Sequence, residues 1–177
     1  MHSIKLGSLF GLELRVAPLL FLNGSVALWI ALVASAVIVL RWSWLDALIG
    51  GLIAVILHWD GEIMHQLGHA WAARRVGSPM LGIRLGTLGI FSTALYPRDE
   101  PALPARIHIT RALGGPIASV IVSLVAGMIV LALDPIGGIV RALAWFFLFE
   151  NFFVFALGAL LPLGFNDGST LLEWWKK

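Results

Sequence analysis

Four long apolar stretches dominate the pattern of hydrophobic and polar positions along the chain. They run approximately over residues 18–40, 45–73, 106–133 and 139–161. Each is close to the roughly 20 residues that a helix needs to cross the hydrocarbon core of a bilayer. The pattern therefore predicts a membrane protein with about four transmembrane helices.

A period of two indicates extended structure in two other places. Near the N-terminus, Leu12, Leu14 and Val16 alternate with Glu13 and Arg15, which predicts a short extended segment that leads to the first helix. We expect this segment to lie at the membrane interface.

The second alternating stretch lies between the second and third apolar stretches. Leu81, Ile83 and Leu85 alternate there with glycine and arginine, and a second extended run follows. This favours a glycine-rich, membrane-associated β-hairpin from about Pro79 to Tyr96. Such a hairpin can offer an unpaired edge to an extended peptide, although a solvated interfacial turn explains the pattern equally well. The predicted fold is thus an all-α membrane protein with one short hairpin and one extended segment.

Composition supports a membrane location. The sequence is 59% hydrophobic and 12% charged, and its mean hydropathy is +0.93, far from the balance of a soluble domain. No polar linker divides the chain, so residues 1–177 are expected to form a single domain, and no removable signal peptide is expected. Because cysteine is absent, chemistry must come from histidine, carboxylate and hydroxyl groups.

The basic residues are distributed unequally between the two sides that four spans create. Ten lie on the side of the termini and the middle loop, against two on the other side, so the positive-inside rule predicts a multi-pass protein of the cell membrane with both termini cytoplasmic. Nucleic-acid binding is not needed to explain the net charge of +2. The ten are Lys5, Arg15, Arg74, Arg75, Arg84, Arg98, Arg106, Arg111, Lys176 and Lys177, and the two are Arg41 and Arg141.

One face of the second predicted helix is polar. His58, Glu62 and Gln66 recur at steps of four residues, and His65 and His69 flank the same face. Ionisable groups within a membrane span are costly to bury, and by default they mark a functional site.

Two histidines one helical turn apart can direct their rings to a common zinc ion. A pair of interhelical hydrogen bonds is the structural alternative for His65 and His69. A third ligand is needed if one coordination position is kept for water, and the best candidate is Asp167 in "LLPLGFNDGSTLL". By its position alone, Asp167 is better explained as the cap of a short helix.

Together, three stretches resemble motifs of the site-two protease family of intramembrane zinc metalloproteases. They are "HQLGHAWAARRVG", "ALGGPIAS" and "LLPLGFNDG", and their order and spacing along the chain agree with those of the family. The resemblance implies that His65, His69 and Asp167 hold Zn²⁺. It also implies hydrolysis of a peptide bond in or near a transmembrane segment of another, membrane-anchored protein. In the topology that the basic residues predict, the zinc end of the helix lies towards the cytoplasm.

Gln66 departs from this pattern at the position of the catalytic glutamate. A carboxamide cannot accept and return a proton near neutral pH, so this form of the chain should be nearly inactive. A natural non-catalytic scaffold that binds membrane partners and an enzyme whose glutamate has been replaced both explain Gln66, and the near-identical shape of the two side chains favours replacement. We expect Glu62 to hold a ring proton of a histidine and not to act as a substitute base.

The resemblance leaves the groups that bind substrate less well defined. Positions where the family often has asparagine carry Ala159 and Ser119, and the buried Asn151 is a candidate to compensate. Substrate or lipid contacts are expected from the hairpin, and the oligomeric state stays open. The substrate-binding candidates are Leu81, Ile83, Leu85, Ser119 and Asn151.

A third hypothesis, in which His58, His65, His69 and His108 bind haem or carry protons, leaves the motif around Asp167 unexplained.

Overall fold

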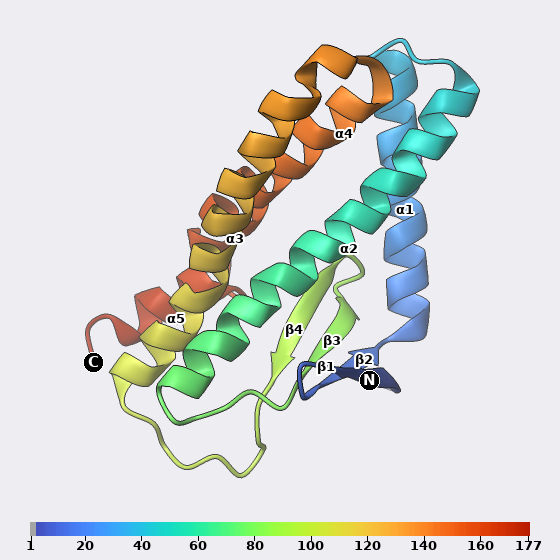
Figure 1. Cartoon of the computed structure of the whole chain (residues 1–177). Helices are drawn as coiled ribbons and strands as arrows, with labels where there is room; N and C mark the ends of the chain where they lie inside the picture. Colours follow the sequence, from blue (N-terminus) through green and yellow to red (C-terminus); the bar gives the residue numbers. More distant parts are fainter. Residues whose placement is uncertain (1–2) are drawn as a thin grey trace.

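The computed structural model describes residues 3–177 and is mostly helical (Figure 1). It contains four helices that are long and apolar enough to cross a membrane, and their bounds lie within two residues of the four predicted stretches. They are α1 (Pro18–Ile38), α2 (Trp44–Arg75), α3 (Ala105–Leu133) and α4 (Gly138–Phe149), which continues as a π-helix (Glu150–Leu157) and a 3₁₀ turn (Gly158–Leu160).

Local sequence signals explain where the longest helix, α2, begins and ends. The side chain of Ser43 caps its N-terminus by accepting a hydrogen bond from the backbone N–H of Asp46. Arg74 and Arg75 lie in the last turn, where a positive charge interacts favourably with the helix dipole. Between these ends α2 spans 32 residues, enough to carry both the core face and the polar face of the molecule.

The extended segments form one four-stranded sheet, which corrects the prediction of an all-α fold with an isolated hairpin. The order is β1-β2-β3-β4, with antiparallel pairing at both edges and parallel pairing of β2 with β3 in the centre. The alternating pattern indicated the strands but contained no signal for the pairing between β2 and β3, which lie far apart in the chain. The strands are β1 (Ile4–Leu9), β2 (Leu12–Val16), β3 (Gly82–Thr87) and β4 (Phe91–Leu95).

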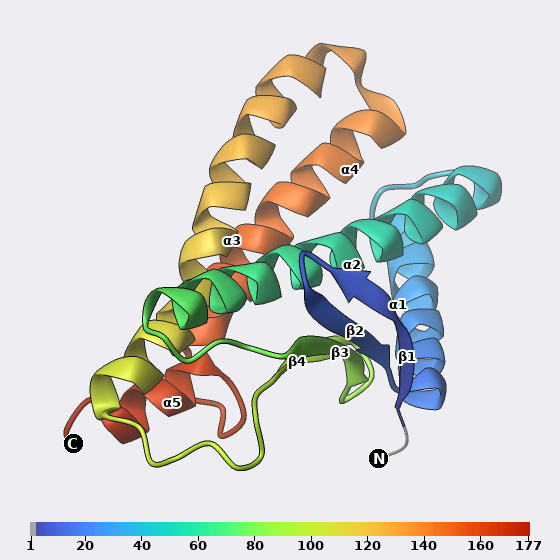
Figure 2. The same ribbon diagram turned by 60° about the horizontal axis from the view of Figure 1, so that its bottom comes forward.

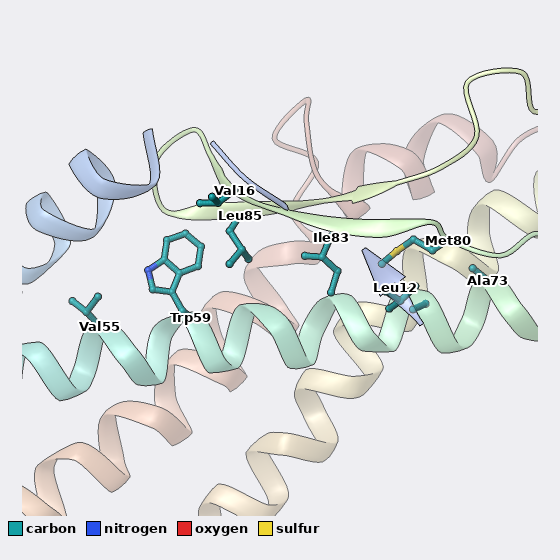
Figure 3. Packing of buried hydrophobic residues seen from close by; sticks show 9 residues of the cluster. Leu12, Val16, Val55, Trp59, Ala73, Met80, Ile83 and Leu85 are labelled. Atoms are coloured by element: carbon teal, nitrogen blue, oxygen red, sulfur yellow. The ribbon is translucent and has the colours of Figure 1, made fainter. Parts of the chain in front are cut away.

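The sheet packs against one face of α2 and forms the apolar core (Figures 2 and 3). Leu12, Ile83 and Leu85 are 2%, 0% and 5% exposed, and they pack with Trp59 and Val55 of α2. At roughly 25 cal/mol per Å² of buried apolar surface, side chains of this size each contribute about 1.5–3 kcal/mol. This core fixes the sheet on α2, so that β4 lies beside the polar face of the helix.

Both termini and the loop between β4 and α3 lie at the same end of the helices (Figure 1). The turn between α1 and α2, which contains Arg41, and the start of α4, which contains Arg141, lie at the opposite end. The arrangement therefore has the separation of basic residues that the sequence predicts, while the direction of the molecule across a membrane stays a prediction.

Candidate metal centre

Close contact between α2 and α3 creates the site. A Cβ atom on Gly68 would lie 2.3 Å from the carbonyl oxygen of Gly114, and a Cβ on Gly114 would lie 2.5 Å from that of Gly68. The two backbones can therefore touch only because neither residue has a side chain. This contact brings α3 against the turn of α2 that carries His65 and His69.

The Nδ1 atoms of both histidines face α3. Nδ1 of His69 lies 2.8 Å from the carbonyl oxygen of Arg111 and 3.2 Å from the backbone nitrogen of Gly115. The shorter contact is to a carbonyl, which only accepts, and therefore places the proton on Nδ1. Nδ1 of His65 lies 3.0 Å from the hydroxyl of Ser119, which can accept in the same way. Both Nε2 atoms then present lone pairs, as metal ligation requires.

Asp167 completes the cluster from the short helix α5 (Asp167–Trp174). The residue that caps this helix is Asn166, whose side chain accepts from the N–H of Ser169. The alternative role of Asp167 as the cap is therefore wrong. Its two carboxylate oxygens face the Nε2 atoms of His65 and His69.

The three ligand groups converge with the spacing that zinc requires. The two Nε2 atoms are 3.1 Å apart, and the carboxylate oxygens of Asp167 lie 3.2 Å and 3.4 Å from the Nε2 atoms of His65 and His69. Ligands on a tetrahedral zinc ion with bonds of about 2.0–2.1 Å are separated by about 3.3 Å. His65, His69 and Asp167 thus fit three positions of a zinc site and leave the fourth open.

Gly115 provides the room for this site. A Cβ atom at position 115 would lie 2.4 Å from Nε2 of both His65 and His69. Any residue with a side chain would therefore fill the space on which the two lone pairs converge. The motif "ALGGPIAS" thus contributes to the site a residue that has no side chain.

A cavity of about 550 Å³ opens from the cluster. Gln66 lines it, and the side-chain oxygen of Gln66 has no hydrogen-bond partner within residues 3–177. The residue at the position expected for a general base therefore lines the same cavity as His65, His69 and Asp167. Strand β4 forms the facing wall through Phe91, Ser92, Thr93 and Ala94.

An ion pair between Arg111 and Glu100 lines part of the cavity. Arg111 is 6% exposed, and its guanidinium bonds both carboxylate oxygens of Glu100, one of them at 2.9 Å. The same group donates to the carbonyl of Ser78 at 2.6 Å and lies 4.1 Å from the ring centroid of Tyr96, and burial raises the pKa of Tyr96 to about 12. Arg111 therefore joins the loop before α3 to α3 itself. Its own backbone carbonyl orients the ring of His69.

The residues that the sequence suggested for substrate binding lie elsewhere. Ile83 and Leu85 are buried in the core, and Leu81 is exposed but is not among the cavity-lining residues. Ser119 contacts His65, and Asn151 is fully buried and donates to the carbonyl of Phe147. None of the five lines the cavity. For Ile83 and Leu85 the reason is that β3 is an inner strand of the sheet and its apolar residues pack against α2.

The structure also corrects the expectation for Glu62. Its carboxylate bonds Ser92 and not a histidine ring. His58 pairs with Glu150, and His108 stacks on Trp174 at 4.0 Å, so neither joins the cluster of possible metal ligands. The sequence analysis missed Ser92 and its neighbours in β4, although they lie within the predicted hairpin.

Comparison with known proteins gives a similar fold in one solved structure, the Site-2 Protease from Methanocaldococcus jannaschii. The TM-score is 0.58 with 17% sequence identity, and the match covers 97% of this chain and 70% of that one. No family model and no curated protein matches the chain. Four long helices beside a small sheet, with the metal-ligand cluster between α2, α3 and α5, thus occur on a fold similar to that of a site-2 protease.

Proposed function

We propose that this chain is an intramembrane zinc endopeptidase of the site-two type, which Gln66 makes nearly inactive. The observation that supports the proposal most strongly is the convergence of His65, His69 and Asp167 at one end of a cavity between helices long enough to span a membrane. The similarity to the fold of a site-2 protease agrees with it.

The three ligands would hold the metal, and their partners would orient them. The carbonyl of Arg111 and the hydroxyl of Ser119 fix the rings of His69 and His65, and such contacts commonly account for 10–100-fold in metal affinity or activity. A bound Zn²⁺ ion supplies a water of lowered pKa and polarises the scissile carbonyl.

Position 66 decides whether the site can transfer protons. A glutamate there would take the proton of the water and pass it to the leaving amine, whereas the carboxamide of Gln66 cannot. Losing a positioned general base typically costs on the order of 10²- to 10⁴-fold in rate. The presence of Gln66 in the lining of the cavity, together with the three ligands, supports the assignment of this position to the general base.

The substrate is proposed to be an unwound stretch of a transmembrane or membrane-anchored protein. Helical peptide bonds are shielded by their own hydrogen bonds, so the substrate must become extended before hydrolysis. Strand β4 is the edge of the sheet and lines the cavity, and an extended segment added to it would gain main-chain hydrogen bonds close to the metal ligands.

Restoring the carboxylate tests the proposal. We expect purified, zinc-loaded Gln66→Glu protein in liposomes to cleave a membrane-anchored substrate at least about 10²-fold faster than the parent chain. His65→Ala in the same background should abolish the cleavage. A Gln66→Glu protein that binds zinc but cleaves none of a panel of membrane-anchored substrates would instead favour the second candidate, a non-catalytic scaffold, which Gln66 itself suggests.

A further inference from the structure

The turn between β3 and β4 packs tightly against two membrane-spanning helices. A Cβ atom on Gly24 of α1 would lie 2.3 Å from the carbonyl carbon of Gly89, and one on Gly86 would lie 2.8 Å from the backbone nitrogen of Phe21. Irregular backbone beside membrane-spanning helices is tolerated only where protein groups satisfy its N–H and C=O groups. The partners of this turn must therefore come from the helices around it.

Two buried side chains of α2 supply those partners. Glu62, which is 4% exposed, accepts hydrogen bonds from both the backbone N–H of Ser92, at 2.8 Å, and the hydroxyl of Ser92. His58, which is 3% exposed, places Nε2 2.7 Å from the carbonyl oxygen of Ile90. Helix α2 therefore bonds the last residue of the turn and the second residue of β4.

The ring of His58 is fixed from its other side. Nδ1 lies 2.8 Å from a carboxylate oxygen of Glu150, at the start of the π-helix. Because the carbonyl of Ile90 only accepts, Nε2 carries a proton, and a second proton lies between Nδ1 and Glu150. The pair is then neutral as a whole, either as imidazolium with carboxylate or as imidazole with carboxylic acid, so it can be buried without an uncompensated charge.

The spacings of helix and strand match at this contact. Four residues of helix rise about 6 Å, and two residues of strand rise about 6.6 Å. His58 and Glu62 are four residues apart on α2, while Ile90, the last residue of the turn, and Ser92, in β4, are two residues apart along the chain. Both bonds can therefore form at once in one alignment of β4 with α2, and a shift of β4 by one residue would break them.

We infer that Glu62 and His58 are positioning residues that set the alignment of β4 relative to the metal ligands, and thereby which substrate bond reaches them. The inference rests on the proposed function for its last step. The next turns of the same helix carry His65 and His69, so a single rigid element bears both the metal ligands and the contacts that place the substrate-receiving strand. Neither residue is assigned a part in proton transfer.

Hydrogen exchange in the parent chain tests the holding of β4. We expect Glu62→Ala to raise the exchange rate of the amides of residues 91–95 about tenfold or more, because Ser92 loses a charged acceptor. Glu62→Gln keeps an oxygen acceptor and should stay near the parent, as should Asp60→Ala, which removes an exposed carboxylate two residues away. Zinc content should be equal in all of them. If Glu62→Ala does not fold, Ser92→Ala, which removes only the hydroxyl donor, should give a smaller rise in the same amides.

Mapping of the cleaved bond tests the consequence. We expect Gln66→Glu protein, with or without Glu62→Gln, to cut one main bond of the substrate. Gln66→Glu protein that also carries Glu62→Ala should cut several neighbouring bonds. Unchanged exchange in β4, or the same single bond in every variant, would overturn the inference. If Gln66→Glu protein does not cleave at all, the proposed function fails, while the exchange measurement still decides whether Glu62 holds β4.

Discussion

Individual residues explain why the three motifs belong together. The sequence identified His65, His69 and Asp167 from their types and spacing, and the structure brings the three within ligand distance of one another. Residues that matter because they have no side chain could not be identified so directly. Gly115 is needed because a Cβ there would meet both rings, and that distance depends on how α3 crosses α2, which no local pattern contains.

Gly115→Ala is therefore expected to weaken zinc binding by about 100-fold or more, because the added methyl group would push the two imidazole rings out of place. Gly127→Ala is the matched control, since a Cβ at position 127 has no neighbour within 4 Å and lies on the same helix. Zinc per chain after dialysis against a chelator of known affinity gives the measurement. Equal zinc retention by the two variants would contradict the geometry of the site.

The Glu100–Arg111 pair predicts a specific dependence on pH. The hydrogen bond from Arg111 lowers the pKa of Glu100 below its ordinary value of 4.5. A carboxyl group whose pKa is lower in the folded than in the unfolded protein stabilises the fold at pH values above its unfolded-state pKa. This stabilisation is lost as the pH falls through the folded-state pKa. The thermal midpoint of the parent should thus exceed that of Glu100→Gln above pH 5, and the two should converge below pH 4.5. A difference that persists unchanged at lower pH would show that the ion pair is not its cause.

At the scale of elements, the helices could be predicted and the sheet only in part. Each helix has a continuous apolar run of membrane-spanning length, which is a local property. The pairing of β2 with β3 depends on contact between distant segments, such as the close approach of Gly82 to Glu13. For the same reason the residues that the sequence suggested for substrate contact include Ile83 and Leu85 of the inner strand β3. The edge strand that lines the cavity is β4.

Gly24→Ala tests the packing of α1 on the turn between β3 and β4. Helix propensity alone favours alanine by about 1 kcal/mol, whereas a Cβ 2.3 Å from Gly89 should cost about 1–3 kcal/mol by overpacking. We expect a lower thermal midpoint for Gly24→Ala, and an unchanged or higher one for Asn23→Ala, which alters an exposed neighbour. A higher midpoint for Gly24→Ala would show that the turn does not contact α1.

At the scale of the whole molecule, charge predicts an orientation that the fold alone does not give. The absence of cysteine from the sequence allows single reporters to be introduced. Asp99→Cys lies at the end with the termini, and Ile136→Cys lies at the opposite end; both positions are exposed. In intact cells an impermeant thiol reagent should label Ile136→Cys and leave Asp99→Cys unlabelled until the membrane is opened. The reverse pattern would place the metal ligands near the outer side.

The central claim is that His65, His69 and Asp167 bind one zinc ion, and X-ray absorption at the zinc edge tests it most directly. The purified parent chain is predicted to carry one zinc per molecule, with two imidazole nitrogens at about 2.0–2.1 Å and oxygen in the remaining positions. Asp167→Ala should change the oxygen shell and weaken binding. A protein that takes up no zinc, or whose spectrum shows fewer than two imidazole ligands, would contradict the account.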